Sequence, residues 1–375
     1  MELHRADKLS PFIVMDILSE AQKYDDVIHM EIGEPDLLPS PQVMENLEKA
    51  VKERKFFYTP ALGLVELREK IAEFYYKKYG VEVSPERIAI TPGTSGAFLV
   101  AYTITLNAKD RIILPDPSYP CYKNFARILD IEPVFVNVDK STNYEVRKEM
   151  IEEIEAKALH ISSPQNPTGT LYSEKTLKEL AQYCEDKGIF LISDEIYHGL
   201  VYEGKEHTAL EFSDKAIVIN GFSKYFCMPG FRIGWIILPS ELVRKAEIVI
   251  QNIFISAPTL SQYAALGAFD YEYLEKVRKT FEERRNFLYS SLKNLFTIDA
   301  KPDGAFYIWA DISKYSKDSY KFAMEVLKKA KVAITPGIDF GKNKTKKYVR
   351  FAYTRSIENL EEGIERIKKF LEKIS

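Results

Sequence analysis

The chain of 375 residues has few of the residues that build disulfide frameworks and metal sites. Its three cysteines lie far apart and form no Cys-x-x-Cys pair; they are Cys121, Cys184 and Cys227. This usage is typical of a reducing compartment and excludes a disulfide scaffold or a cysteine zinc site. The five histidines are scattered without ligand spacing, so the sequence predicts no metal site.

Long apolar runs and an excess of charge of one sign are also missing. No apolar run approaches the length of a membrane span, and residues 1–7 lack the apolar core of a signal peptide. The 52 basic and 55 acidic residues are mixed along the chain and leave a net charge of −3. We therefore expect a cytoplasmic protein that binds neither membranes nor nucleic acid.

What the chain does have is enough apolar material for two domains. Hydrophobic residues make up 46% of it and aromatic residues 13%, and its length exceeds that of a single-core domain. Between about residues 87 and 238, β-rich runs alternate with helical patterns such as 95–106 and 176–187. The seven predicted strands are 87–91, 111–114, 133–138, 158–162, 190–193, 217–220 and 232–238. Apolar strands separated by helices indicate an α/β fold with a mostly parallel sheet covered on both faces.

After about residue 240 the pattern changes to long charged helices, including 272–295 and 357–373. Two strand-like segments, 305–311 and 348–353, lie between them. This pattern predicts a smaller α+β domain made of residues 1–41 and 271–375, beside a large domain of residues 42–270.

The segment 219–235 places one lysine, Lys224, among apolar residues and glycines. A desolvated lysine loses its charge more easily, and the neutral amine can form a Schiff base with a carbonyl. Arg232, eight residues later, offers a planar guanidinium that suits a phosphate. Together they suggest a phosphorylated aldehyde cofactor. The alternatives are a lysine whose amine reaches water from a strand edge and an arginine in an ordinary ion pair.

Other polar residues follow predicted strands, where ligands bind in parallel sheets. Asp194 ends an apolar run with Tyr197 three residues later; such an acid can keep a ring nitrogen protonated, or simply cap a helix. In Pro92-Gly-Thr-Ser-Gly, the backbone and the hydroxyls of Thr94 and Ser95 can bind a phosphate, although a plain glycine turn looks the same.

Three further positions carry possible ligand contacts. Asn166 lies between two prolines on a rigid turn, where its amide can meet a ring hydroxyl or a carboxylate. Tyr119 follows a strand and can stack on a planar ring. Arg350, in an apolar and aromatic strand, can bind a carboxylate through both guanidinium arms, or an acidic neighbour at a strand edge.

In their order along the chain, from Gly33-Glu-Pro-Asp to Arg350, these segments resemble the fold-type I, class I and II family of pyridoxal-phosphate-dependent aminotransferases. The resemblance spans nearly the whole chain, and it rests on seven motifs in order rather than on any one of them. It implies a large cofactor domain and a small domain built from both termini, in agreement with the pattern of strands and helices.

The resemblance also implies roles for individual residues. Lys224 would bind pyridoxal phosphate as an internal aldimine and act as the acid–base group, with Asp194 and Tyr197 as its catalytic partners. Asp194 would pair with the pyridine nitrogen, Tyr197 and Asn166 would bond the ring oxygen, and Tyr119 would stack on the ring. The residues implied for the phosphate are Thr94, Ser95, Ser223, Arg232 and, from the partner subunit of a homodimer, Tyr58. Those implied for the substrate carboxylate are Gly33, Asn166 and Arg350.

The implied reaction moves the amino group of an L-amino acid to a 2-oxo acid. Aspartate or glutamate with 2-oxoglutarate is the leading expectation, because such members are frequent in the family, and alanine and aromatic amino acids are the next alternatives. Tyr119 stands where many members have Phe or Trp, and Leu37-Leu38-Pro39 departs from the usual Phe-Xaa-Thr-Pro at the entrance. Same-fold alternatives are a β-eliminating lyase, such as a cystathionine β-lyase, and an aminocyclopropane carboxylate synthase. A pyridoxal-phosphate sensor domain of a regulator is a further alternative.

Overall fold

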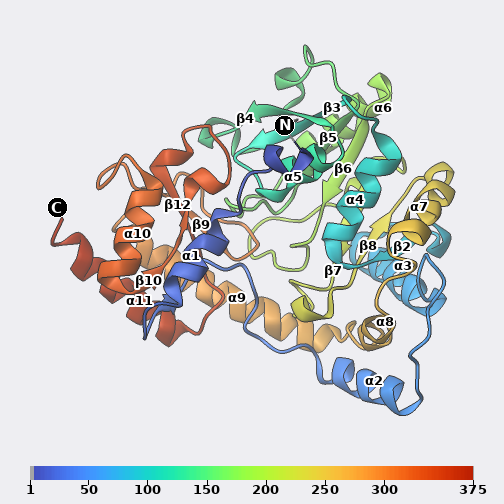
Figure 1. Ribbon diagram of the computed structural model, residues 1–375, viewed down its shortest axis with the longest axis horizontal. Helices are drawn as coiled ribbons and strands as arrows, with labels where there is room; N and C mark the ends of the chain where they lie inside the picture. The colour runs from blue at the N-terminus through green and yellow to red at the C-terminus, as the bar shows by residue number, and fades with distance from the viewer. Residues whose placement is uncertain (1–3, 375) are drawn as a thin grey trace.

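A seven-stranded sheet forms the centre of the computed structural model, which describes residues 4–374 (Figure 1). The strands lie in the order β2-β8-β7-β6-β5-β3-β4, and only β8 runs antiparallel to both of its neighbours. Their bounds are β2 (Ile88–Thr91), β3 (Arg111–Asp116), β4 (Glu132–Asn137), β5 (Ala158–Ser162), β6 (Phe190–Asp194), β7 (Ile217–Gly221) and β8 (Gly234–Ile237). The predicted mostly parallel sheet is thereby confirmed.

Helices cover both faces of this sheet, as its uninterrupted apolar strands require. Ile217 and Ile219 of β7 pack with α4 and α7, whereas Val218 belongs to the cluster with α3 and α6 on the opposite face. The helices of this region are α2 (Pro41–Lys52), α3 (Val65–Tyr79), α4 (Gly93–Thr105), α5 (Cys121–Ile128), α6 (Glu174–Lys187), α7 (Ser240–Ile253) and α8 (Thr259–Ala265). The period-two alternation of strand side chains thus divides the core into two layers.

The C-terminal part of the chain gathers beside the sheet, together with the first helix (Figure 1). An antiparallel sheet in the order β11-β12-β9 and a parallel pair β1-β10 form its strands. The elements are α1 (Ile13–Ala21), β1 (Ile28–His29), α9 (Tyr271–Leu292), β9 (Tyr307–Asp311), α10 (Ser319–Ala330), β10 (Val332–Ala333), β11 (Thr335–Pro336), β12 (Tyr348–Ala352) and α11 (Ile357–Leu371). The sequence predicts β9 and β12, but two-residue strands are too short to give a periodic signal.

Several predicted boundaries are wrong. Arg232 was expected to open the last strand of the large sheet, but β8 begins at Gly234 and Arg232 adopts a left-handed φ of 51°. A short turn over Pro229–Phe231 precedes it and takes the chain out of the extended conformation. The helix expected from Ser95 begins earlier, at Gly93, so Ser95 lies within its first turn. Helices α9 and α11 end two or three residues before the expected positions.

The carboxyl ends of three parallel strands meet at one edge of the large sheet. Ser162 of β5 is paired with Asp194 of β6, and Asp194 is paired with Ile219 of β7. Ligands in open parallel sheets bind at this edge. Within residues 4–374 no helix combines the length and the hydropathy needed to cross a membrane. Part of the expectation that the N-terminus is no signal peptide falls on residues 1–3, outside the described residues.

Candidate active site

A cavity of about 360 Å³ opens at the carboxyl ends of β5, β6 and β7. Eleven of the twelve predicted site residues line it: Gly33, Thr94, Ser95, Tyr119, Asn166, Asp194, Tyr197, Ser223, Lys224, Arg232 and Arg350. Tyr58 does not line the cavity, and its side chain is 77% exposed. Segments that are hundreds of residues apart therefore converge on one site.

Lys224 lies three residues after β7 and projects its amine into the cavity. Its Nζ donates a hydrogen bond to the carbonyl oxygen of Gly33 at 2.7 Å. Burial lowers the pKa of Lys224 to about 8, against a smaller opposing effect from the carboxylate of Glu34. A substantial fraction of this amine is therefore neutral near physiological pH and can act as a nucleophile.

Asp194 is the last residue of β6 and is 3% exposed. Its carboxylate accepts hydrogen bonds from the Tyr122 hydroxyl at 2.5 Å and from the Ile196 backbone N–H at 3.1 Å. Burial raises the pKa of Asp194 to about 6. No cationic side chain within residues 4–374 forms an ion pair with it, so a protonated ring nitrogen would supply the partner that this buried carboxylate lacks.

An anion site lies at the start of α4. Thr94 and Ser95 occupy its first turn, where backbone N–H groups are free and the helix dipole favours negative charge. Gly93 has a φ of 65°, and a Cβ there would lie 2.7 Å from Nη2 of Arg232. The positive φ favours glycine here, and a side chain would also displace the guanidinium from its place beside the helix start. Arg232 also donates to the Pro229 carbonyl at 2.9 Å, and it retains other N–H groups for a phosphate.

Arg350 is 4% exposed in β12 and has no carboxylate partner in the described part of the chain. Its guanidinium donates to Oδ1 of Asn166 at 2.8 Å and to the Glu31 carbonyl at 2.6 Å, while its buried Nε has no partner. The rings of Tyr307 and Phe340 lie 4.1 and 4.8 Å from its Cζ. A desolvated guanidinium in such surroundings suits a bidentate carboxylate ligand.

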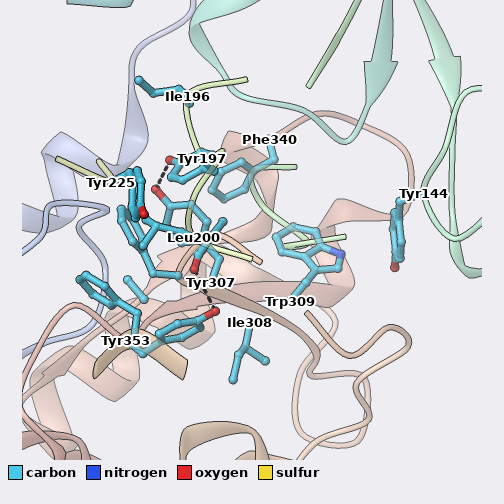
Figure 2. Close-up of a cluster of buried hydrophobic side chains, with 14 of the residues drawn as sticks. Tyr144, Ile196, Tyr197, Leu200, Tyr225, Tyr307, Ile308, Trp309, Phe340 and Tyr353 are labelled. Atoms are coloured by element: carbon cyan, nitrogen blue, oxygen red, sulfur yellow. Dashed lines mark hydrogen bonds between the residues drawn. The ribbon is translucent and has the colours of Figure 1, made fainter. Parts of the chain in front are cut away.

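Two tyrosines complete the polar part of the site. The hydroxyl of Tyr197 is hydrogen-bonded to that of Tyr307 at 2.7 Å, and Figure 2 shows the two side chains meeting. Tyr119 packs edge-on against Tyr122 and Phe12, with ring centroids 5.3 and 6.0 Å away. These contacts hold the Tyr119 ring in the cavity wall.

The family comparison now identifies the chain. Residues 25–367 match the family described as "Aminotransferase class I and II". The chain belongs to this family, and it is an aminotransferase.

Relatives of this aminotransferase match it along nearly its whole length. It is 43% identical to a (5-formylfuran-3-yl)methyl phosphate transaminase of Methanocaldococcus jannaschii, over 96% of this chain and 97% of that one. It is 36% identical to a valine–pyruvate aminotransferase of Mycobacterium tuberculosis, over 96% of each chain. A crystal structure of an aminotransferase from M. tuberculosis superposes with a TM-score of 0.96 at 34% identity, covering 100% of this chain and 99% of that one. The predicted family and the fold-type I architecture are confirmed.

Class I and II aminotransferases use pyridoxal phosphate. The cavity of this aminotransferase has matching chemistry for each part of that molecule: an amine for the aldehyde, an unpaired acid for the ring nitrogen and an anion site for the phosphate. The buried, unpartnered Nε of Arg350 adds a place for a substrate carboxylate. The residues present therefore fit the cofactor.

The sequence did not indicate several residues that line this site. Tyr122, in the first turn of α5, holds the Asp194 carboxylate, and no motif in the sequence marks it. Tyr307 contacts both Tyr197 and Arg350 from β9, and a Cβ on Gly33 would collide with its hydroxyl at 1.8 Å. The apolar residues of the N-terminal segment that line the mouth are Phe12, Val14, Met15 and Leu18. Phe12, Met15 and Leu18 are spaced three apart, a helical pattern visible in the sequence.

Proposed function

We propose that this aminotransferase binds pyridoxal phosphate covalently through Lys224 and transfers the amino group of an L-amino acid to a 2-oxo acid. One observation carries the proposal: a lysine with a pKa lowered to about 8 shares a cavity with a buried acid that has no cationic partner. A structural lysine in the same place would be expected to pair with that acid.

Each residue role is part of the same proposal. Asp194 holds the pyridine nitrogen, Tyr197 and Asn166 bond the ring oxygen, and Tyr119 lies against the ring. The residues proposed for the phosphate are Thr94, Ser95, Ser223 and Arg232. The bound cofactor supplies an aldehyde that takes up the amino group and a ring that withdraws electrons from the substrate Cα.

The remaining steps belong to the side chains of the protein. Arg350 binds the substrate α-carboxylate with Asn166 and the backbone of Gly33, and this fixes the direction of the Cα–H bond. The neutral amine of Lys224 would accept the proton from the substrate Cα. It would then donate that proton to C4′, the cofactor carbon that carries the aldehyde. Its lowered pKa suits both directions of proton transfer near neutral pH.

We propose a donor with an uncharged side chain, rather than the aspartate or glutamate expected from the sequence. The cavity contains three cations, Lys224, Arg232 and Arg350, and each already has a role. The mouth is lined by the α1 wall, which we define as Phe12, Met15 and Leu18. A second carboxylate placed against these side chains would find no cationic or hydrogen-bonding partner among them. The two relatives named above act, by name, on valine and on a phosphorylated furan aldehyde.

The proposal includes a homodimer in which Tyr58 reaches the phosphate of the partner subunit. Phe56, Phe57 and Tyr58 are 58%, 84% and 77% exposed, three consecutive aromatic side chains in the loop after α2 at the margin of the molecule (Figure 1). Such a patch is typical of an interface. Light scattering should give the mass of two chains, and Tyr58→Ala should weaken cofactor binding without changing that mass; a monomeric active enzyme would contradict the dimer.

We also propose that residues 42–270 form the cofactor domain and that residues 1–41 and 271–375 form the small domain. The pairing of β1 with β10 and the packing of α1 on β10 and β11 support the joining of both termini in one unit.

The partly exposed Cys121 and the buried Cys184 and Cys227 are all unpaired, which supports a reducing cytoplasmic location.

A donor panel tests the activity. The purified enzyme with pyridoxal phosphate is incubated with valine, alanine, phenylalanine, aspartate or glutamate, each with 2-oxoglutarate and with pyruvate, and the new amino acid is quantified. We expect exchange with uncharged donors to exceed exchange with aspartate. Release of ammonia or thiol with every amino acid would instead favour the β-lyase, and cofactor binding without any turnover would favour the sensor.

A further inference from the structure

A second cavity, of about 250 Å³, lies beside the active site. Tyr119 lines both cavities, and the N-terminal segment runs between them: Pro11 and Ile13 line the second cavity, whereas Phe12 and Val14 line the first. The other walls of the second cavity come from α5, from the loop 338–342, and from Asp116, Ser118 and Phe135, in or just after β3 and β4. None of the roles proposed above uses this space.

Three cations line this second cavity. Lys123 and Arg127 lie four residues apart on one face of α5, and Lys342 extends from the opposite loop. Among the described residues no carboxylate lies within 4.0 Å of any of the three charged groups, and Arg127 bonds a neutral atom, Oγ of Ser10, at 2.9 Å. Elsewhere the surface pairs such charges, as Arg5 and Lys8 do with Asp130.

Two carboxylates also face the cavity, but backbone amides already occupy them. Asp339 accepts the N–H groups of Ile13 and Val14 at 3.0 and 3.2 Å. Asp116 accepts those of Lys342 and Asn343 at distances between 2.9 and 3.2 Å. These hydrogen bonds orient both carboxylates toward the backbone. The three cationic side chains therefore outnumber the two carboxylates, and both carboxylates already accept backbone N–H groups.

The cavity is also partly shielded from water. Burial raises the pKa of Asp116 and of Asp339, and it lowers the pKa of Lys123. The hydroxyl of Ser118, a residue only 8% exposed, forms no hydrogen bond within the part of the chain that the structure describes. A partly desolvated ammonium, a guanidinium and a hydroxyl therefore lie on one concave surface, beside two carboxylates that already accept backbone hydrogen bonds.

We propose that this second cavity is an anion site that binds a phosphate group through Lys123 and Arg127, with Lys342 at its edge. A phosphate offers the oxygen acceptors that the three cations and the Ser118 hydroxyl lack. The phosphate is either a free anion or the distal group of a substrate whose reacting end lies in the active site. The site itself stands on its own geometry; only its use by a substrate rests on the proposed function.

Calorimetric titration of the cofactor-loaded enzyme with inorganic phosphate, at constant ionic strength, tests the site. Lys123→Gln and Arg127→Gln should each weaken binding about tenfold or more, because each removes a charge-assisted hydrogen bond. Lys178→Gln, on the exposed face of α6, is the matched control and should bind as the wild type does. Absence of phosphate binding by the wild type, or equal affinity in all four proteins, would overturn the proposal.

A second arm identifies the source of the phosphate. Rates with 3-phosphohydroxypyruvate and with hydroxypyruvate as acceptors are compared in the wild type and in Lys123→Gln. A loss of kcat/KM confined to the phosphorylated acceptor assigns the site to a substrate, whereas equal rates assign it to the free anion. Calorimetry needs no turnover, so failure of the aminotransferase proposal would appear in the rates and leave the binding result intact.

Discussion

The two walls of the active-site cavity differ in almost every physical property. The sheet wall, which we define as Asn166, Asp194 and Lys224, consists of polar groups at strand ends, and Asp194 is only 3% exposed. The α1 wall is apolar, and its Met15 is 51% exposed. Under the proposed function, the first wall supplies groups for the reaction and the second selects substrates by shape and polarity. Chemistry and substrate choice then reside in different parts of the molecule.

The two walls are also held differently. Asp194 ends β6 and Lys224 lies three residues after β7, and both strands of the central sheet are fully or nearly fully buried. Helix α1 buries Val14, Ile17 and Ala21, and the carboxylate of Asp339 accepts two of its first N–H groups from the other end of the chain. The sheet wall can keep charges in unfavourable surroundings because its backbone is fixed by neighbouring strands. The α1 wall can change its side chains with little effect on that sheet.

Lys224→Ala should have the largest effect. Removal of the amine eliminates both the covalent attachment and the proton transfer, and the second loss alone reduces turnover by about 10²- to 10⁴-fold. Steady-state rates of amino-group transfer measure the change. Lys178→Ala serves as the control for loss of one lysine, and circular dichroism should show the same fold in all three proteins. Near-normal turnover in Lys224→Ala would show that Lys224, and with it the sheet wall, does not take part in the reaction.

Asp194→Asn should stabilise the cofactor-free enzyme, and the gain should depend on pH. Between pH about 4 and 6 the unfolded chain has released the Asp194 proton while the folded chain retains it, so wild-type stability falls as pH rises through this window. The loss is complete above a pH of about 6 and amounts to up to about 3 kcal/mol for a shift of about two units. Asparagine does not ionise, and the Tyr122 hydroxyl can accept from its amide.

Urea unfolding at pH 4.5, 6 and 8 measures this difference in the free energy of unfolding. The advantage of Asp194→Asn over the wild type should grow from pH 4.5 to 6 and then stay constant. Met15→Ala, on the α1 wall, should follow the pH dependence of the wild type at every point. If Asp194→Asn is less stable than the wild type at pH 8, or if its advantage does not vary with pH, the ionised Asp194 carboxylate does not lower the free energy of unfolding of the wild type.

Met15→Arg should have the smallest effect on the overall rate, and its effect should be confined to the choice between amino-acid donors. A cation in the α1 wall gives a second carboxylate a partner, so the ratio of kcat/KM for aspartate over valine should rise by about tenfold. Met15→Gln, which adds polarity without charge, should change the ratio much less. If both variants leave the ratio at its wild-type value, substrate choice does not reside in α1.

The residues of the sheet wall could be predicted from the sequence because the apolar pattern locates the strands along the chain and the family resemblance covers the motifs that follow them. Lys224, Asp194 and Asn166 stand out as polar groups at the ends of apolar runs. The α1 wall could not be predicted, because Phe12, Met15 and Leu18 look like an ordinary amphipathic stripe until the helix is seen over the cavity.

Other features depend on contacts between distant segments. Tyr307 meets Tyr197 over 110 residues and Asp339 meets Ile13 over 326, and neither local propensity nor periodicity contains this information. The apolar neighbours Phe231 and Ile233 predict a strand at Arg232, whereas the structure has a left-handed turn there. The position of Tyr58 at a partner subunit remains a prediction.

Borohydride reduction of the enzyme loaded with pyridoxal phosphate shows which lysine holds the cofactor. Reduction makes the bond between the cofactor and its lysine permanent, and peptide mass spectrometry then locates the pyridoxyl group. We expect the pyridoxyl label on Lys224, in the peptide that joins β7 to the turn before β8, and no label on the other lysines. A label on a different lysine, or cofactor bound without any reducible bond, would contradict this expectation.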